Sequence, residues 1–236
     1  MKLLSAEFVT SAAGGEVPRD GLAQIALVGR SNVGKSSLIN ALTRSKIART
    51  SAAPGKTRLA NVYRVALEAG PGGPGGWSVY LVDLPGYGYA RGGADAASEL
   101  RAIAEACFGR QRGGARNFGS ASSTWTADNP GLQRGDQGRS DADLKFRAPL
   151  SAVLLLIDSR HPALETDQAA AQWLEGLGLR PIVVATKIDK LTRAERARNL
   201  KTLETTFGMA AAPVSAQSGE GLDDLWQMIA KLARKP

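Results

Sequence analysis

The chain of 236 residues has one cysteine, one histidine and no long hydrophobic run. The single cysteine, Cys107, cannot form a disulfide within the chain, and no cysteine–histidine cluster has the spacing of a zinc site. The most apolar stretch, residues 152–157, is far shorter than the ~20 residues that cross a membrane. The first residues hold only a two-residue apolar run before an acid, unlike a signal peptide. We therefore expect a cytoplasmic protein with no membrane partner.

Acidic residues are absent between Gly21 and Leu67, although the whole chain holds 22 Asp and Glu against 30 Lys and Arg. The formal excess of +8 therefore lies in this stretch, whose cations are Arg30, Lys35, Arg44, Lys46, Arg49, Lys56, Arg58 and Arg64. Such a field indicates either a solvated face or a surface that binds the polyanionic backbone of a nucleic acid. Composition alone leaves both interpretations open.

Strong aliphatic side chains are almost missing from residues 109–147, where only Leu132 and Leu144 stand among seven glycines. Such a segment cannot bury enough apolar surface to offset the entropy lost on ordering. We expect a disordered Gly/Arg/Ser-rich insertion here, within a single domain that spans residues 1–236.

One segment matches the phosphate-binding pattern G-x-x-x-x-G-K-[ST]. It lies between an expected strand at residues 24–28 and an expected helix at residues 37–42. Its residues, with the first of the helix, are Gly29, Arg30, Ser31, Asn32, Val33, Gly34, Lys35, Ser36 and Ser37. In such a loop, backbone N–H groups surround a polyphosphate, the lysine adds a charge at the β- and γ-phosphates, and the Ser36 hydroxyl binds Mg²⁺.

A second segment, Asp83-Leu84-Pro85-Gly86, ends an apolar strand. In a phosphate-loop protein this carboxylate holds Mg²⁺ through a water, and the Gly86 N–H meets the γ-phosphate. Thr57 is our candidate for a switch threonine that reaches Mg²⁺, because Pro54-Gly55-Lys56-Thr57 comes directly before an expected strand. Thr50 and Ser51 are the competing candidates for that ligand.

Two later segments predict that the base is guanine. Thr186-Lys187-Ile188-Asp189 fits the pattern [NT]-K-x-D, in which the carboxylate accepts both N–H groups on the guanine edge and the lysine stem lies along the base. Adenine lacks this pair of donors, so Asp189 favours GTP over ATP. The triplet Ser215-Ala216-Gln217 follows the last expected strand and is placed to offer a backbone N–H to the guanine carbonyl.

Strands and helices alternate along the chain. The expected strands are residues 24–28, 59–67, 77–83, 151–158, 181–186 and 210–214, and the expected helices are residues 37–42, 94–108, 164–177, 192–207 and 221–233. This alternation predicts an α/β fold of the P-loop NTPase G-domain type. Its sheet has six strands, mostly parallel with one antiparallel strand, and helices cover both faces.

With these motifs the chain resembles the EngB family of bacterial ribosome-biogenesis GTPases. The resemblance covers approximately residues 5–108 and 148–234, and it is carried by residues 29–40, 54–57, 81–90, 158–162 and 186–190 and by Trp226. It implies a cytoplasmic, monomeric GTPase that binds GTP and GDP and assists assembly of the large ribosomal subunit. The GTP state would switch its affinity for the ribosomal RNA and proteins of the precursor, and the family also implies a role in cell division and septation.

Two departures from the family concern the partner surface. The insertion at residues 109–147 is longer than usual, and residues 91–110 lack the usual Trp/Tyr pattern. The resemblance also favours an RNA-facing role for the acid-free basic stretch.

Tyr87 follows Gly86, at the position where Ras-like enzymes place a glutamine that orients the attacking water. A phenol cannot replace that amide, so we expect slow intrinsic hydrolysis that a partner or a cation accelerates. Asn32 is a candidate K⁺ ligand, since an asparagine at this position ligates K⁺ in related GTPases; otherwise it only stabilises the loop. Lys35, Thr57 and Asn32 are thus the candidate catalytic residues.

Three alternative functions remain at this point. A nucleotide-dependent RNA-binding module with incidental turnover is compatible with Tyr87. A GTPase domain for membrane transport is disfavoured by the missing membrane segment, and an ATPase is disfavoured by Asp189.

We expect His161, the only histidine, to have a structural or partner-surface role, and Cys107 to lie in the core.

Overall fold

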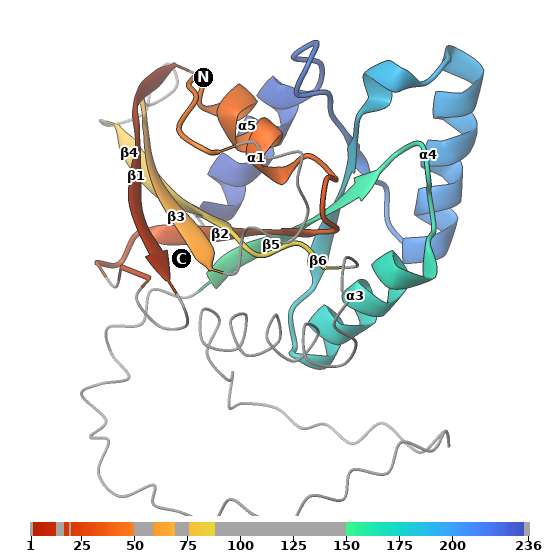
Figure 1. Cartoon of the computed structure of the whole chain (residues 1–236), viewed down its shortest axis with the longest axis horizontal. Coiled ribbons are helices and arrows are strands. Elements are labelled where there is room, and N and C mark those ends of the chain that lie inside the picture. Colours follow the sequence, from red (N-terminus) through yellow and green to blue (C-terminus); the bar gives the residue numbers. More distant parts are fainter. Residues whose placement is uncertain are drawn as a thin grey trace, which may run out of the picture.

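The computed structural model describes residues 2–12, 17–18, 20–49, 59–68, 76–87 and 150–233. A seven-stranded sheet of order β1-β3-β4-β2-β5-β6-β7 forms its centre (Figure 1). Its strands are β1 (Leu3–Ala12), β2 (Ala23–Gly29), β3 (Ala60–Leu67), β4 (Trp77–Asp83), β5 (Leu150–Asp158), β6 (Pro181–Thr186) and β7 (Ala212–Pro213). Because β3 alone runs against the other strands, the predicted fold class, mostly parallel with one antiparallel strand, is confirmed.

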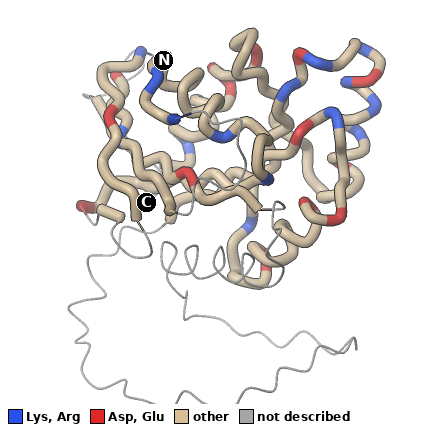
Figure 2. Tube along the Cα trace, viewed as in Figure 1, with Lys and Arg blue, Asp and Glu red and all other residues tan. Residues whose placement is uncertain are grey.

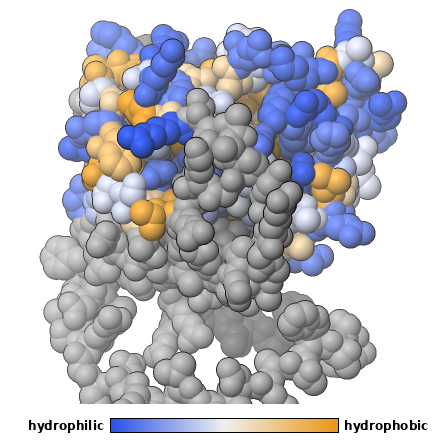
Figure 3. Space-filling view, viewed as in Figure 1, coloured by the Kyte–Doolittle hydropathy of each residue, from blue (hydrophilic) through white to orange (hydrophobic). Residues whose placement is uncertain are grey.

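The sheet has one strand more than the six that we predicted. The additional strand, β1, pairs antiparallel with β3 from Leu3 opposite Leu67 to Ala12 opposite Ala60. Two register shifts interrupt this pairing, and Leu4 and Phe8 remain 55% and 51% exposed at the edge of the sheet. Apolar side chains gather near this edge, at the left of Figure 3. The strand was not predicted because its apolar residues do not alternate with polar ones in the pattern of a half-buried strand.

Helices cover both faces of the sheet, as Figure 1 shows. On one face lie α1 (Lys35–Leu42) and α5 (Leu222–Ala233), and on the other lie α3 (Glu165–Gly176) and α4 (Arg193–Phe207). A single turn of 3₁₀-helix, η1 (Ile188–Lys190), follows β6. These bounds lie within two residues of the expected ones. The expected helix at residues 94–108, with Cys107, and the insertion at residues 109–147 fall outside the described residues.

Neighbouring residues of β2 belong to opposite cores, as the period of a strand requires. Ile25 and Leu27 pack with Leu38 of α1, whereas Ala26 and Val28 pack in the core that contains Leu174 of α3. Both faces of the central strands are therefore buried, which explains their nearly continuous apolar sequences.

Two local features fix the helices that flank the candidate site. At the start of α4, Thr192 and Glu195 form a capping box, in which each side chain binds the other residue's backbone N–H. In α5, the indole N–H of Trp226 donates to the carbonyl of Leu42 at 3.0 Å, which joins α5 to the end of α1. In the described part of the chain, no helix is both long enough and apolar enough to cross a membrane.

Candidate nucleotide-binding site

The parallel strands β2, β4, β5 and β6 end at the same edge of the sheet. Leu27 pairs with Asp83, and Asp158 pairs with Thr186, so the loops after these strands begin side by side. In open α/β sheets, ligands bind in the crevice outside the carboxyl ends of the strands. The predicted phosphate, magnesium and base segments all start at this edge.

The phosphate loop has a backbone that restricts its side chains. Gly34 has φ +109° and comes directly before α1, a conformation that glycine adopts without strain. Gly29 is close-packed, because a Cβ there would lie 2.9 Å from the carbonyl oxygen of Leu156. Asn32 also has a positive φ, +63°, and its residue is exposed. The loop geometry therefore explains both glycines of the motif and the tolerance for asparagine between them.

Lys35 turns its ammonium back over the loop that precedes it. The Nζ atom donates to the carbonyl oxygens of Gly29 at 3.1 Å and Arg30 at 3.4 Å. Burial lowers the pKa of Lys35, although the nearby carboxylate of Asp83 opposes this effect. The ammonium thus lies inside the loop, where its positive charge would attract a bound phosphate group.

Ser36 and Asp83 form a pair of oxygen ligands suited to a divalent cation. The Ser36 hydroxyl donates to Oδ2 of Asp83 at 3.1 Å, and Oδ1 of Asp83 is buried with no hydrogen-bond partner among the described residues. Burial raises the pKa of Asp83 against the opposing effects of Lys35 and Ser36. An unpaired buried carboxylate oxygen beside a hydroxyl fits Mg²⁺, which prefers such ligands. Gly55 and Thr57 lie outside the described residues.

The turn after β4 lies directly against the phosphate loop. Ser31 donates its backbone N–H to the carbonyl oxygen of Tyr87 at 3.0 Å and its hydroxyl to that of Gly86 at 3.4 Å. A Cβ added to Gly86 would lie 2.8 Å from the N, Cα and Oγ atoms of Ser31. Only glycine allows this approach, which places Gly86 beside the loop as its predicted contact with a γ-phosphate requires.

The predicted base-binding residues, with the exception of Ser215, line one pocket of about 370 Å³. Its walls come from the phosphate loop and the start of α1, from the segment after β6 and from the segment after β7. The lining residues are Val33, Gly34, Ser37, Leu38, Thr186, Lys187, Asp189, Lys190, Val214, Ala216 and Gln217. The structure therefore brings together segments that lie more than 150 positions apart in the sequence.

Asp189 is held in place by its neighbours. The Ser215 hydroxyl donates to Oδ1 of Asp189 at 2.7 Å, and the ammonium of Lys190 lies 3.3 Å from Oδ2. The hydrogen bond from Ser215 is the main reason that the pKa of Asp189 lies below its ordinary value. The same hydroxyl accepts the N–H groups of Gln217 and Ser218, so Ser215 also fixes the turn after β7. The carboxylate is thus ionised, oriented and beside the pocket.

Lys187 joins the base end of the site to the phosphate end. It has φ +60°, and its ammonium donates to the carbonyl of Asn32 at 2.6 Å and to Oδ2 of Asp158 at 2.9 Å. The hydroxyl of Thr186 donates to the carbonyl of Val33 at 2.9 Å. Two adjacent side chains thereby fasten the segment after β6 to the loop after β2.

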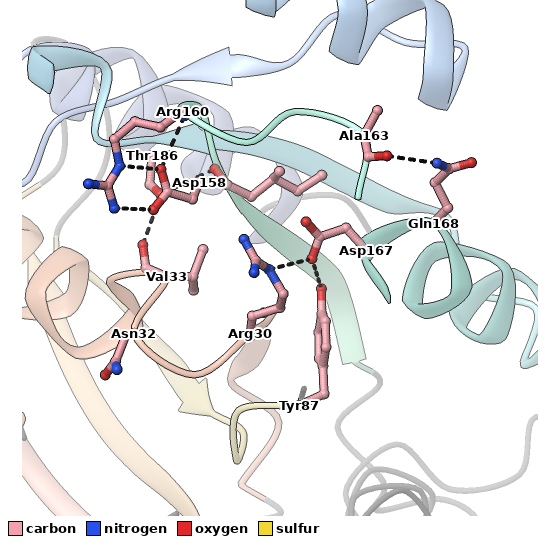
Figure 4. A network of polar contacts seen from close by, with 12 residues as sticks. Arg30, Asn32, Val33, Tyr87, Asp158, Arg160, Ala163, Asp167, Gln168 and Thr186 are labelled. Atoms are coloured by element: carbon pink, nitrogen blue, oxygen red, sulfur yellow. Dashed lines mark hydrogen bonds and ion pairs between the residues drawn. The ribbon is translucent and has the colours of Figure 1, made fainter. Parts of the chain in front are cut away.

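Asp158 was not among our predicted site residues, although it anchors this network (Figure 4). The guanidinium of Arg160 donates to both of its carboxylate oxygens, at 2.9 and 2.7 Å. Burial alone would raise the pKa of Asp158, but the hydrogen bonds from Arg160 and Lys187 outweigh it and hold this pKa well below its usual range. The sequence signal for Asp158 is the segment of residues 158–162, which is one of those that carry the family resemblance.

Asp167 and Arg30 form a second contact that sequence reasoning missed. Asp167 of α3 lies between Arg30 and Tyr87, and all three are drawn in Figure 4. In the same view the amide of Asn32 points away from the pair formed by Asp158 and Arg160. His161 is exposed, as a partner-surface role would require, and within the described ranges no three His, Cys, Asp or Glu residues form a metal-binding group.

Comparison with known proteins agrees with this geometry. Residues 24–109 match the family described as "50S ribosome-binding GTPase". "Probable GTP-binding protein EngB" of Alkaliphilus metalliredigens is 37% identical over 232 residues, which cover 96% of this chain and 89% of the relative. The protein of the same name from Anaeromyxobacter sp. (strain K) is 37% identical over 238 residues, which cover 99% of this chain and 93% of the relative.

Solved structures share the fold. A crystal structure of a probable GTP-binding protein EngB has a TM-score of 0.53 at 21% identity, covering 91% of this chain and all of the other. Era in complex with MgGDPNP and nucleotides 1506–1542 of 16S ribosomal RNA has a TM-score of 0.58 at 21% identity, covering 91% of this chain and 57% of the Era chain. Since relatives match almost the whole chain at 37% identity, the chain belongs to the EngB family of GTP-binding proteins and is a GTPase.

Proposed function

We propose that this protein is a GTP-controlled assembly factor that binds the precursor of the large ribosomal subunit in its GTP state and leaves after hydrolysis. The observation that carries the proposal is a cluster of exposed cations in the loop that follows α1, the helix that the phosphate loop opens. The family description "50S ribosome-binding GTPase" supports the same partner. A role in cell division and septation follows from the family resemblance alone.

The basic surface consists of Arg44, Lys46 and Arg49, which are all exposed. They lie in the loop that follows α1, and this loop carries blue but no red positions in Figure 2. Phosphate groups of RNA attract such a field, and the attraction weakens as salt increases. The surface begins at the end of the helix that the phosphate loop opens, so nucleotide state and RNA contact could be coupled.

Asn40 gives this loop a fixed shape. Its side-chain amide donates to the carbonyl of Ala48 at 2.8 Å and accepts the N–H of Ala48 at 2.8 Å. Ala48 itself is buried, while the neighbouring Arg49 is exposed. A braced loop loses less conformational entropy on binding, which favours a role in recognition over that of a merely solvated segment.

We infer the role of each residue in nucleotide binding from its place in the site. Residues 29–37 would surround the phosphates, Gly55 and Gly86 would approach the γ-phosphate, and the residues after β6 and β7 would hold guanine. Ser36 and Thr57 would bind Mg²⁺ directly, and Asp83 would bind it through a water. When bound, Mg²⁺ neutralises charge on the β- and γ-phosphates.

Tyr87 supports the expectation of slow intrinsic hydrolysis. Its hydroxyl donates to Asp167 at 2.9 Å, so it is engaged away from any attacking water. We infer that acceleration comes from the ribosomal partner or from K⁺ at Asn32. We further infer a monomeric G domain spanning residues 1–236 that acts in the cytoplasm, with residues 109–147 as an accessory insertion.

Pelleting with purified large subunits tests the proposed function. The protein is incubated with GDP or a non-hydrolysable GTP analogue over a salt series, and Arg44, Lys46 and Arg49 are changed together to Ala. We expect binding in the GTP-analogue state only. Because each phosphate contact contributes about 0.7–0.9 to the slope of log K against log salt, the loss of three contacts in the triple variant should reduce that slope by about two to three.

A matched control removes the same charge from α4, on the opposite face of the sheet. Arg193, Arg198 and Lys201 are exposed there, and their joint change to Ala should leave pelleting unchanged. Equal losses in both triple variants would contradict a specific basic surface. Binding that is independent of nucleotide, with no stimulation of hydrolysis by the subunit, would instead favour an RNA-binding module with incidental turnover.

A further inference from the structure

Asp167, in the first turn of α3, is a buried carboxylate to which two parts of the nucleotide site converge. Its side chain is 0% exposed, and its Oδ1 atom accepts the hydroxyl of Tyr87 at 2.9 Å. The Nε atom of Arg30 lies 3.2 Å from the same oxygen (Figure 4). Oδ2 is buried and has no hydrogen-bond partner among the described residues. Because these two groups alone, among the residues that the structure describes, contact the buried charge, the loss of either one would be destabilising.

The position of Asp167 is set by the start of α3. Its N–H donates to the carbonyl of Leu164 at 2.9 Å, and the amide of Gln168 donates to the carbonyl of Ala163 at 2.9 Å. Ala163 has φ +63°, so the chain turns sharply just before the helix. The positive end of the helix also favours a carboxylate in this turn. Asp167 is therefore a fixed point to which the other parts of the site are bound.

Arg30 and Tyr87 belong to the two segments that face the phosphates. Arg30 lies in the loop after β2, and Tyr87 lies in the turn after β4, directly following Gly86. Their backbones form an isolated parallel bridge, and the N–H of Ser31 donates to the carbonyl of Tyr87. The backbone of the turn is thus bound to the loop on one side, and its tyrosine side chain is bound to α3 on the other.

We propose that Asp167 is a positioning residue that keeps Gly86 against the phosphate loop, by holding the Tyr87 hydroxyl and the Arg30 guanidinium together. This rests on the proposed role of Gly86 as a donor to the γ-phosphate. GDP lacks that phosphate, so the contact matters for GTP alone. Asp167 thereby sets how strongly the protein distinguishes its two nucleotides, without touching either of them.

The electrostatics of the three residues agree with this arrangement. Burial, together with the nearby charge of Asp167, holds the pKa of Tyr87 well above its usual range, so the phenol keeps the proton that it donates. Burial also raises the pKa of Asp167, against the opposing effects of Tyr87 and Arg30. Removing either partner leaves a buried carboxylate with fewer compensating contacts.

The test measures dissociation constants for GDP and for a non-hydrolysable GTP analogue with the purified full chain. Tyr87→Phe removes one hydroxyl, Asp167→Asn removes the charge, and the double variant combines them. Because hydrogen bonds to charged groups are among the stronger ones, each single variant should weaken binding of the GTP analogue about tenfold. GDP binding should change by less than about twofold. The double variant should bind the GTP analogue as tightly as the single variant with the lower affinity, because the effects of residues in contact are not additive.

Tyr80→Phe is the matched control. The hydroxyl of Tyr80 also donates to an aspartate, Asp20, at 2.7 Å, but Asp20 lies outside the candidate site, before the start of β2. This variant should leave the ratio of the two dissociation constants unchanged. A purely structural role for Asp167 would lower the melting temperature and weaken both nucleotides equally, which would overturn the proposal.

Other outcomes separate this inference from the proposed function. Additive effects of the two single changes, or an unchanged ratio in Tyr87→Phe, would also overturn it. If Asp167→Asn does not fold, Tyr87→Phe still decides the result. An unmodified protein that binds neither nucleotide would refute the nucleotide site itself, whereas failure to bind ribosomal subunits would not affect this test.

Discussion

The ammonium of Lys187 lies 2.6 Å from the carbonyl oxygen of Asn32, although 155 positions separate the two residues. The same ammonium binds Asp158, and the adjacent Thr186 binds the carbonyl of Val33. The loop that would hold phosphate and the segment that would hold guanine are therefore one connected unit. A substitution at the guanine end of the site is therefore expected to affect the binding of phosphate as well.

Asp189→Asn should convert the base preference from guanine to xanthine. The carboxylate accepts two N–H groups, whereas an amide offers one acceptor and one donor, which suits the extra carbonyl of xanthine. We expect the affinity for GTP to fall about 100-fold, since a site built for charge-assisted pairing rejects a mismatched partner strongly. The affinity for xanthosine triphosphate should rise. Both affinities can be measured by the displacement of a fluorescent guanine nucleotide.

Asp223→Asn provides the control for this exchange. Asp223 lies exposed in the first turn of α5, outside the pocket, so its change should leave both affinities as they are. If Asp189→Asn retained its full affinity for GTP, guanine recognition by Asp189 would be refuted.

Gly86→Ala should separate GTP from GDP binding. The added methyl would lie 2.8 Å from the backbone of Ser31, which cannot rotate away as a side chain could. The turn must therefore leave the phosphate loop, and we expect affinity for a GTP analogue to fall by at least about tenfold through loss of one charge-assisted hydrogen bond. GDP affinity should stay nearly constant, as titration calorimetry would show.

Gly176→Ala is the corresponding control, because nothing lies within 4 Å of a Cβ at that position in α3. It should leave both affinities unchanged and slightly stabilise the helix. Parallel losses for GDP and the GTP analogue in Gly86→Ala would show that the methyl disturbs the whole site instead of the turn.

Asp158→Asn should lower stability more at neutral pH than in acid. The folded protein holds the pKa of Asp158 below the ordinary value of 3.8, so the ionised form stabilises the fold above that pH. This contribution is lost as the pH falls below 3.8 toward the pKa in the folded state. Denaturant unfolding should therefore show a difference of about 1–3 kcal/mol at pH 7, typical of bonds to a charged group, that shrinks below pH 4.

Arg160→Met tests the cause of this pH dependence. It removes the guanidinium that donates to both oxygens of Asp158 and keeps much of the side-chain length. It should lower the pH-dependent part of the free energy of unfolding. The loss should be smaller than in Asp158→Asn, because Lys187 still donates to Asp158. A constant destabilisation by Asp158→Asn from pH 7 to pH 3 would argue against the ion pairs.

Asn32→Gly should abolish any acceleration of hydrolysis by K⁺. Glycine adopts the φ of +63° found here, so this variant removes the amide without straining the loop. If Asn32 ligates K⁺, the unmodified protein should hydrolyse GTP at least about tenfold faster in K⁺ than in Na⁺, as a charge near the β/γ bridge would produce. The variant should be equally slow in both salts, and equal rates in the unmodified protein would defeat the K⁺ hypothesis.

The sequence was most informative where each strand ends in a recognisable loop. Glycine, proline and polar residues mark those ends, so β4 and β6 were predicted with their observed bounds. The candidate base residues after β6 and β7 meet at one pocket for the same reason. By contrast, β1 has no regular alternation, and it forms a strand because β3 offers it an edge.

The contact between Tyr87 and Asp167 could not be predicted, because it depends on where α3 is placed against the turn after β4. Eighty positions separate these residues, and neither lies in a local pattern that requires the other. Asp167 in particular looks like an ordinary first-turn acid of a helix. Long-range side-chain contacts follow from packing, and packing becomes visible only once the elements are assembled.

The distance in sequence between the walls of the pocket also has a consequence for folding. Lys187 and Thr186 reach back to the phosphate loop, and Trp226 reaches back to Leu42 across 184 positions. A nucleotide seated in this pocket would contact the first and last thirds of the chain at once, and only the fully folded chain offers both. By mass action, such a ligand at 100 times its dissociation constant stabilises the folded state by about 2.7 kcal/mol. The nucleotide would thus serve the chain first as a ligand that favours completed folding, before it serves as a switch.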